Sequence, residues 1–222
     1  MTRKITHLIY DFDGLLMDTE PIHWQVNTTL AKRYNRTFDL ETHLAIIGRP
    51  ALVSAQIIVD RLNLPLTAAA YLVERDAIIF DLYPQAQPLP GALTLTEHFY
   101  QAGIPQAIAT SSDAHRFERK ISQYPEWLNR FTCIVTGDDP AIAAGKPAPD
   151  CFLVTAERLK TTPDRCLVFE DSVAGVRAAK RAGMAVIAIP SPELSRSHFQ
   201  AADLILDSLL EFQPTAWGLP PN

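Results

Sequence analysis

Two aspartates, Asp11 and Asp13, follow a short apolar run and precede Gly14 in the order Asp-Phe-Asp-Gly. Carboxylates with this spacing at the end of a strand lie close together, and they repel unless a cation or a proton lies between them. Gly14 would let the chain turn sharply just after them. The motif predicts either a Mg²⁺ site, with one carboxylate as nucleophile and the other as acid and base, or a polar turn that caps a helix. Taken alone, it favours the turn.

A second acidic pair, Glu170 and Asp171, ends another apolar run and precedes Ser172. Hard cations prefer carboxylate, carbonyl and water oxygens, which this pair would supply. Asp171 or Ser172 could instead cap the helix that we expect to begin here. An adjacent acid pair is more than a cap requires, so in combination with Asp11 the pair favours a metal site.

Two further features could hold an anion. Thr110, Ser111 and Ser112 follow a third apolar run, and hydroxyl and backbone N–H groups at a strand-to-helix turn form an anion pocket. Lys146 lies in the stiff segment Gly-Lys-Pro-Ala-Pro, where its ammonium could stabilise charge on a phosphoryl group. As isolated features, the hydroxyl cluster is more typical of a helix cap and the lysine of a solvated surface.

The elements that would position these residues alternate along the chain. Short apolar runs at 5–10, 106–109, 133–136, 166–169 and 185–189 predict five strands, and most of the intervening stretches, such as 150–160, have helical periodicity. This pattern is typical of buried parallel strands joined by helices, so we expect an α/β, Rossmann-like, doubly wound parallel sheet. Ligands of such sheets bind outside the carboxyl ends of the strands, where the polar residues are.

One region interrupts the alternation. From about residue 21 to about residue 88 no strand is expected, whereas 22–34, 51–62 and 68–82 favour helices. We therefore predict a helical cap domain at 19–88, inserted into a core domain made of 1–18 and 89–222. Both connections would pass near the end of the first strand, so the insert would act as a lid.

Composition excludes several classes of protein. With 222 residues, 47% of them hydrophobic and 20% charged, the chain is typical of a folded globular protein. Lys and Arg number 20 against 25 Asp and Glu, and this net charge of −5 argues against a nucleic-acid partner. No segment approaches a membrane span, and the three cysteines form no CxxC pair. We expect a cytoplasmic protein without a membrane or zinc site.

The ordered set of motifs identifies a family resemblance. Residues 11–20, Asp-Phe-Asp-Gly-Leu-Leu-Met-Asp-Thr-Glu, closely resemble the first motif of the haloacid dehalogenase-like hydrolase superfamily, and its later motifs are matched by Thr110, Lys146 and the pair Glu170–Asp171. The segments 55–60, 137–140, 145–150 and 212–220 are similar to the branch that contains pseudouridine-5'-phosphatase and plant phosphatases of glycerol 3-phosphate and FMN. The resemblance covers almost the whole chain.

The resemblance implies a role for each residue. Asp11 would attack phosphorus and form an aspartyl phosphate, while Asp13 would protonate the leaving oxygen and later activate water. Thr110, the Ser111 N–H and Lys146 would hold the phosphoryl group. The implied cofactor is Mg²⁺, with four ligand residues: the side chains of Asp11 and Asp171, the backbone carbonyl of Asp13, and Glu170 directly or through water.

The implied substrate is a small-molecule phosphate ester, with pseudouridine 5'-phosphate the leading candidate. In the cap, Glu20, His23 and Arg49 are the candidate substrate contacts, and we expect a monomer or weak dimer. A β-phosphoglucomutase-like mutase is the alternative, which Asp113 disfavours because its charge would repel a second phosphate. An inactive phosphate-binding protein or a receiver-like signalling protein is a further alternative. An inactive phosphatase would normally have lost Asp11 or Asp13, and a receiver carries no long helical insert after its first strand.

Overall fold

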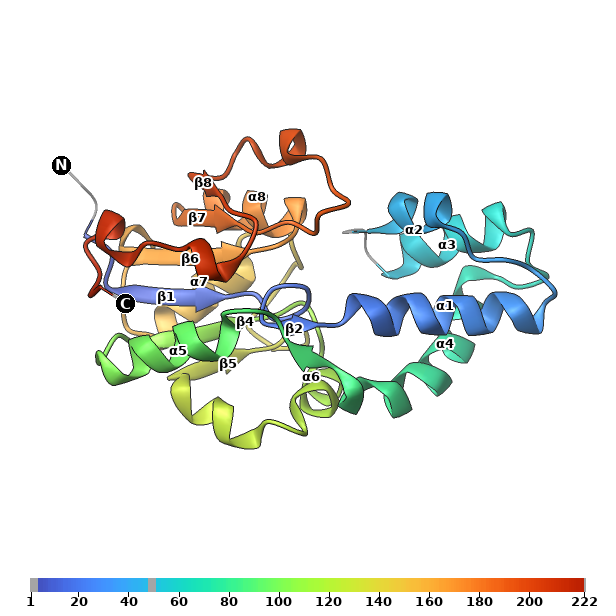
Figure 1. Ribbon diagram of the computed structural model, residues 1–222, viewed down its shortest axis with the longest axis horizontal. Helices are drawn as coiled ribbons and strands as arrows, with labels where there is room; N and C mark the ends of the chain where they lie inside the picture. Colours follow the sequence, from blue (N-terminus) through green and yellow to red (C-terminus); the bar gives the residue numbers. More distant parts are fainter. Residues whose placement is uncertain (1–3, 48–50, 222) are drawn as a thin grey trace. The chain divides into compact units, whose positions relative to one another are not determined.

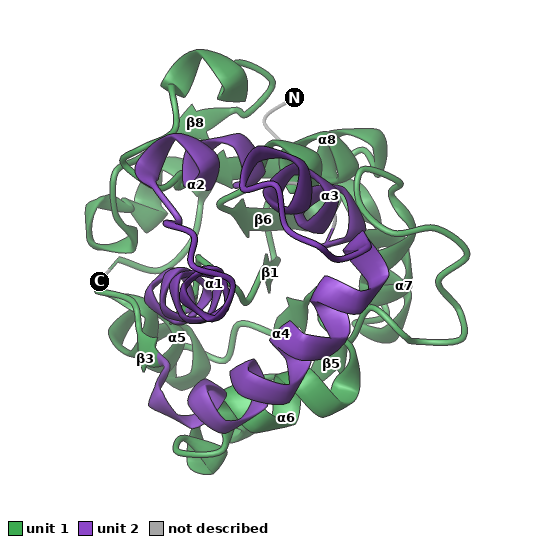
Figure 2. Ribbon diagram, turned by 90° about the vertical axis from the view of Figure 1, so that its right-hand side faces the viewer, with its two compact units in different colours: residues 1–18, 87–222 green, residues 19–86 purple. Residues whose placement is uncertain are grey.

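The computed structural model describes residues 4–47 and 51–221. The chain divides into two compact units, shown in two colours in Figure 2. Unit 1 comprises Met1–Asp18 and Gln87–Asn222, and unit 2 comprises Thr19–Ala86.

Unit 1 is built on a six-stranded, all-parallel sheet with the order β5-β4-β1-β6-β7-β8 (Figure 1). The first strand, β1, lies between β4 and β6, with Leu8 opposite Gln106 on one side and Leu167 on the other. A chain order that reverses on the two sides of β1 creates the switch point at which ligands bind in such sheets. The strands are β1 (His7–Tyr10), β4 (Gln106–Ala109), β5 (Cys133–Val135), β6 (Cys166–Glu170), β7 (Ala185–Ala188) and β8 (Leu204–Ile205).

Helices connect these strands and bury the sheet. The strands β4, β6 and β7 are buried along their whole length, as expected for a parallel sheet covered by helices. Tyr10 stacks on Phe169 with ring centroids 5.0 Å apart, and Phe212 from the C-terminal segment packs edge-on against Phe169. The connecting helices are α5 (Ala92–Gln101), α6 (Ala114–Ile121), α7 (Asp150–Arg158) and α8 (Val173–Arg181), with the 3-10 helix η2 (Pro125–Arg130) before β5.

The sheet confirms the predicted α/β class and contains all five predicted strands, with ends shifted by at most two residues. The prediction omitted β8, which has only two residues. It also expected no strand up to about residue 88, whereas β3 (Gln87–Pro88) pairs antiparallel with β2 (Met17–Asp18). Two-residue strands carry no periodicity that a sequence could display.

Unit 2 is helical, and hydrogen bonds between its own residues cap and join its helices. Its helices are α1 (Glu20–Arg33), α2 (Leu40–Ile46), α3 (Ala51–Arg61) and α4 (Ala68–Leu82), followed by the 3-10 helix η1 (Tyr83–Gln85). Asp39 and Thr67 cap α2 and α4 by accepting hydrogen bonds from Thr42 N and Ala70 N. Between α1 and α4, the buried Tyr71 hydroxyl donates to Asn27 Oδ1 at 2.8 Å. Within the described parts of the chain, no helix is both long and apolar enough to cross a membrane.

Candidate active site

The sheet places Asp11 at the carboxyl end of β1. The Asp11 backbone N–H continues the hydrogen-bond ladder between β1 and β6 by donating to Phe169 O at 2.9 Å. Asp11 is only 6% exposed. The Lys146 ammonium donates to Asp11 Oδ1 at 2.5 Å. A carboxylate buried to this degree needs such a partner, because burial alone disfavours its charge.

Glu170 ends β6, the strand next to β1, and is completely buried. Its Oε1 accepts a hydrogen bond from Lys146 Nζ at 2.5 Å, and its Oε2 accepts from Ser172 N and Oγ at 3.0 and 2.9 Å. Ser172 is also the N-cap of α8, because its Oγ accepts from Gly175 N at 3.0 Å. The capping interpretation of this segment is therefore confirmed for Ser172, and the metal-site interpretation of Glu170 and Asp171 stays a prediction.

Lys146 joins the two strand ends. Its Nζ also donates to Ala109 O at 3.1 Å, at the end of β4, and its side chain is 5% exposed. Burial would lower the pKa of Lys146, but the carboxylates of Asp11 and Glu170 raise that pKa well above its usual value. The ammonium is thus a fixed positive charge at the ends of three neighbouring strands.

Asp11, Glu170 and Asp171 form a cluster whose ligand oxygens lie within 4.8 Å of one another. Lys146 contacts two of these three carboxylates, Asp11 and Glu170, and the oxygen donor set suits a hard divalent cation. Burial raises the pKa of Asp11 to about 7 against the attraction of Lys146, and the charge of Glu170 contributes to this rise. The residues present therefore fit a divalent cation that would balance the remaining negative charge.

Thr110 is buried at the end of β4, and its N–H donates to Val135 O at 3.0 Å. The helix after this turn is capped by Asp113, which accepts from Arg116 N, so capping does not account for Thr110 or Ser111. Beside them lies a cavity of about 50 Å³, lined by Thr110, Ser111, Gly137, Ile142, Gly145, Lys146 and Cys151. This volume suits a few water molecules or one small group, not a whole ligand.

The Asp13 side chain has two contacts that the sequence did not suggest. Lys120 Nζ donates to Asp13 Oδ1 at 2.5 Å, and Ser112 Oγ donates to Asp13 Oδ2 at 2.7 Å. Lys120 lies in the last turn of α6, and the run Glu118-Arg119-Lys120 is typical of a solvated helix face. Its spacing ten residues after Thr110 carries no signal without the fold.

The candidate cap residues all belong to the segment of unit 2. His43 Nε2 lies 3.8 Å from Glu20 Oε2, and the His23 ring nitrogen Nδ1 contacts the Arg75 guanidinium from α4. Arg49 lies outside the described residues. The contact between His23 and Arg75 was not predicted, because a single arginine in a helix carries no distinguishing pattern.

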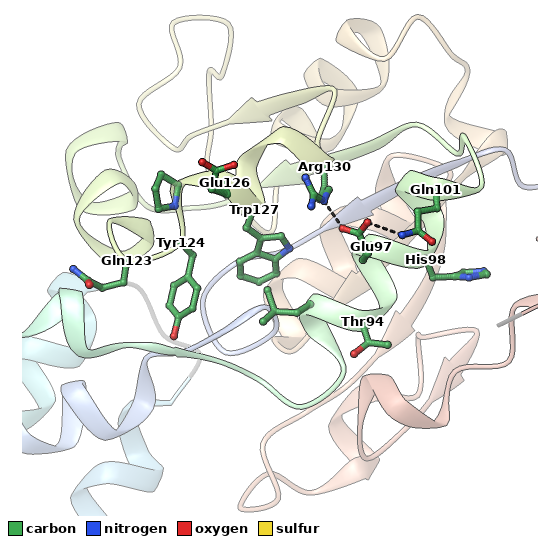
Figure 3. A pocket seen from close by; sticks show the side chains of 11 residues that line it. Thr94, Glu97, His98, Gln101, Gln123, Tyr124, Glu126, Trp127 and Arg130 are labelled. Carbon is green, nitrogen blue, oxygen red and sulfur yellow. Dashed lines mark hydrogen bonds and ion pairs between the residues drawn. The ribbon is translucent and has the colours of Figure 1, made fainter.

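A much larger hollow of about 700 Å³ lies elsewhere on unit 1 (Figure 3). It is lined from α5 by residues such as Glu97 and Gln101 and from the η2 region by Tyr124, Trp127 and Arg130. None of the candidate site residues that the structure describes lines it. Size alone therefore does not identify the functional site in this protein.

Gly175 makes room for Glu170, because a Cβ at position 175 would overlap the Glu170 carboxylate. We expect Gly175→Ala to displace that carboxylate and lower kcat at least about tenfold. Alanine normally stabilises a helix relative to glycine by about 1 kcal/mol, but overpacking of about 1–3 kcal/mol should reverse the sign. Phosphate release and thermal unfolding would measure both effects. Arg177→Ala, on an exposed position of the same helix, is the control, and a stabilised, fully active Gly175→Ala would contradict the expectation.

Comparison with known proteins adds independent information. A family model described as haloacid dehalogenase-like hydrolase matches residues 8–189. The Arabidopsis thaliana protein "(DL)-glycerol-3-phosphatase 1, mitochondrial" is 42% identical over 98% of this chain and 74% of its own length. The Drosophila melanogaster protein "Probable pseudouridine-5'-phosphatase" is 38% identical over 98% of this chain and 96% of its own.

Among solved structures, a "HAD hydrolase, family IA, variant 3" from Entamoeba histolytica HM-1:IMSS matches with a TM-score of 0.81 and 25% identity. The match covers 96% of this chain and 97% of that chain. The sequence motifs, the sheet order and these matches agree. The chain belongs to the haloacid dehalogenase-like hydrolase family.

Proposed function

We propose that this protein is a Mg²⁺-dependent phosphatase that hydrolyses small phosphate monoesters through an aspartyl phosphate. The observation that carries the proposal is the buried group at the strand ends, in which Lys146 bridges Asp11 and Glu170. Such a group combines a nucleophile with fixed positive charge, which is what phosphoryl transfer needs.

Asp11 is the nucleophile in this mechanism. One of its carboxylate oxygens attacks phosphorus in line with the ester oxygen, which leaves as the alcohol after accepting a proton from Asp13. Asp13 then takes a proton from a water molecule that attacks the aspartyl phosphate, releasing inorganic phosphate and regenerating Asp11. Dividing the hydrolysis into two displacements lowers a barrier that is among the highest known for uncatalysed biological reactions.

The other candidate residues hold the transferred group. The Thr110 hydroxyl and the Ser111 N–H would donate to phosphoryl oxygens, and Lys146 would offset their charge. Mg²⁺ bound by Asp11, Asp171, Glu170 and the Asp13 carbonyl would reduce the repulsion between the anionic nucleophile and the phosphate. The helical unit, residues 19–86, would select the leaving group through Glu20, His23 and Arg49.

Substrate choice is tested by a phosphate-release screen with Mg²⁺. Two relatives named for glycerol 3-phosphate are 42% and 41% identical to this chain, and the Drosophila relative named for pseudouridine 5'-phosphate is 38% identical. The screen should therefore include both esters, FMN, sugar phosphates and p-nitrophenyl phosphate. We expect one small ester with a polar, uncharged alcohol part to be hydrolysed at the lowest concentration. No phosphate release from any ester would overturn the proposal.

The screen also addresses the mutase alternative. Asp113 was expected to repel a second phosphate, but its carboxylate accepts from Arg116 N and pairs with the Arg116 guanidinium. The Arg116 guanidinium therefore largely balances the Asp113 charge, so Asp113 repels a second phosphate less than an unpaired carboxylate would. Conversion of glucose 1-phosphate to glucose 6-phosphate at a rate that rivals phosphate release would favour the mutase.

Removing divalent cations should abolish activity. In excess chelator we expect no phosphate release from p-nitrophenyl phosphate, because the Asp11, Glu170 and Asp171 carboxylates would repel the substrate. Adding Mg²⁺ should restore the rate. Ca²⁺ takes more oxygen ligands in a looser arrangement, so we expect it to inhibit. Full activity in chelator, measured with the same metal-free stocks, would contradict the metal site.

Two further expectations accompany the function. A cytoplasmic location stays a prediction, and one relative is named as mitochondrial. The monomer or weak dimer also stays a prediction, which sedimentation at several protein concentrations would measure.

A further inference from the structure

The lysine that contacts Asp13 is buried as deeply as the one that contacts Asp11. The Lys120 side chain is 3% exposed and that of Lys146 is 5% exposed. Moving an ammonium out of water is costly unless the geometry of its partners is favourable. A lysine at a partly exposed position of the same helix would avoid that cost. The burial of Lys120 therefore indicates a functional role for its ammonium group.

The contacts around Lys120 converge on a single carboxylate. Its Nζ donates to Asp13 Oδ1 at 2.5 Å and to Ser112 Oγ at 2.7 Å. Ser112 Oγ in turn donates to Asp13 Oδ2 at 2.7 Å. Both oxygens of Asp13 are thus held, Oδ1 by Lys120 and Oδ2 by Ser112 and, at a longer 3.4 Å, by the Thr110 hydroxyl. Lys120 and Ser112 are also hydrogen-bonded to each other.

The backbone fixes both partners. Ser112 N donates to Thr110 Oγ1 at 3.0 Å, and Gly137 N donates to Ser112 O at 2.7 Å, so this turn is held against the loop after β5. Lys120 is held by α6, whose first turn is capped by Asp113 and whose Phe117 packs on Phe12 with ring centroids 4.6 Å apart. The Asp13 carboxylate is therefore held from two separately anchored segments, the turn after β4 and the helix α6.

We propose that Lys120, together with Ser112, is a positioning residue that orients the Asp13 carboxylate for proton transfer to the leaving oxygen. The inference rests on the proposed function, in which Asp13 is the acid and base. Lys120 acts through Asp13, and its ammonium is engaged with Asp13 and Ser112 instead of the phosphoryl group. General acid catalysis depends on a proton donor within hydrogen-bond reach of its target, so loss of orientation should cost rate more than binding.

The test compares esters that differ in their need for a proton. An alkyl ester such as the best substrate from the screen needs its leaving oxygen protonated, whereas p-nitrophenolate leaves with little help. We expect Lys120→Met to lower kcat/KM for the alkyl ester about 10- to 100-fold, and for p-nitrophenyl phosphate by a much smaller factor. The inhibition constant of inorganic phosphate should stay unchanged.

The matched control is Lys180→Met, which breaks an exposed lysine–aspartate pair with Asp203 in the same unit. We expect this control to keep wild-type kinetics on both esters. Equal losses on both esters in Lys120→Met would overturn the proposal. A phosphate inhibition constant that rises with the loss of rate would also overturn it, since Lys120 would then be a phosphate ligand.

A second variant covers the case in which Lys120→Met does not fold. Ser112→Ala removes the donor to Asp13 Oδ2 and should show the same preference for p-nitrophenyl phosphate, with a smaller factor. Wild-type enzyme that releases no phosphate would defeat the proposed function itself, whereas active wild-type enzyme with unselective Ser112→Ala and Lys120→Met variants would defeat only this inference.

Discussion

Asp11→Asn should abolish phosphate release, with kcat reduced at least about 10⁴-fold, because an amide oxygen cannot form the aspartyl phosphate. The fold should survive, since asparagine has nearly the same shape and can still accept from Lys146. Burial raises the pKa of Asp11 to about 7, so above that pH the native state holds an anion that is costly to bury. In chelator at about pH 8, Asp11→Asn should therefore be at least as stable as the wild type.

Phosphate release from p-nitrophenyl phosphate and thermal unfolding in the same buffer would measure both effects. Asp207→Asn is a suitable control, because Asp207 is largely exposed and pairs with Arg196 on the surface of the same unit. Wild-type turnover by Asp11→Asn would show that the nucleophile lies elsewhere.

Lys146→Met should have the second largest effect, on both stability and rate. Methionine has a similar length but no charge, so Asp11 and Glu170 would lose the cation between them. Removing one partner of a buried ion pair typically costs about 3–5 kcal/mol of unfolding free energy, and we expect a loss of this size near pH 8 in chelator. We also expect kcat/KM to fall at least about 100-fold, because a fixed charge beside the transferred group is lost.

The pH and metal dependence of that loss distinguish an electrostatic cause from poor packing. The Lys146 charge lowers the pKa of Asp11, so without it that pKa would lie above about 7, and the destabilisation relative to the wild type should grow as pH rises through about 7. Mg²⁺ should recover part of the stability if it binds the folded cluster. Denaturant unfolding at several pH values would measure this. A loss independent of both pH and Mg²⁺ would point to packing alone.

Much of the fold was predictable because its elements are locally encoded. The helix α4 was expected at 68–82 and the strand β4 at 106–109, and both have those bounds. In contrast, the pattern gave no bounds for α2, because its apolar side chains Leu40 and Leu44 are exposed while Thr42 and His43 are buried. Its hydrophobic pattern is thus reversed, and Asp39, its N-cap, is the one local signal that a sequence could offer.

In the candidate site, too, some residues could be predicted from the local sequence and others could not. The sequence alone predicts that Asp11, Lys146 and Glu170 lie close together. Each follows a strand or lies in a loop behind one, and parallel strands end at one edge of the sheet. Lys120 could not be predicted, because its burial depends on how α6 packs against the segment that contains Phe12. Long-range packing of this kind leaves no spacing rule in the sequence.

The short antiparallel pair β2–β3 brings together the two chain ends between which the helical unit is inserted. Asp18 and Gln87 are register partners, so a hairpin turn of a few residues could join them without moving either strand. Chain closure through a flexible insert costs only about 0.6 kcal/mol for each doubling of its length, and a folded insert with adjacent ends costs its host still less. Recombination could therefore exchange residues 19–86 as one piece. Under the proposed function, the preference for a leaving group could then diverge in evolution independently of the chemistry at phosphorus.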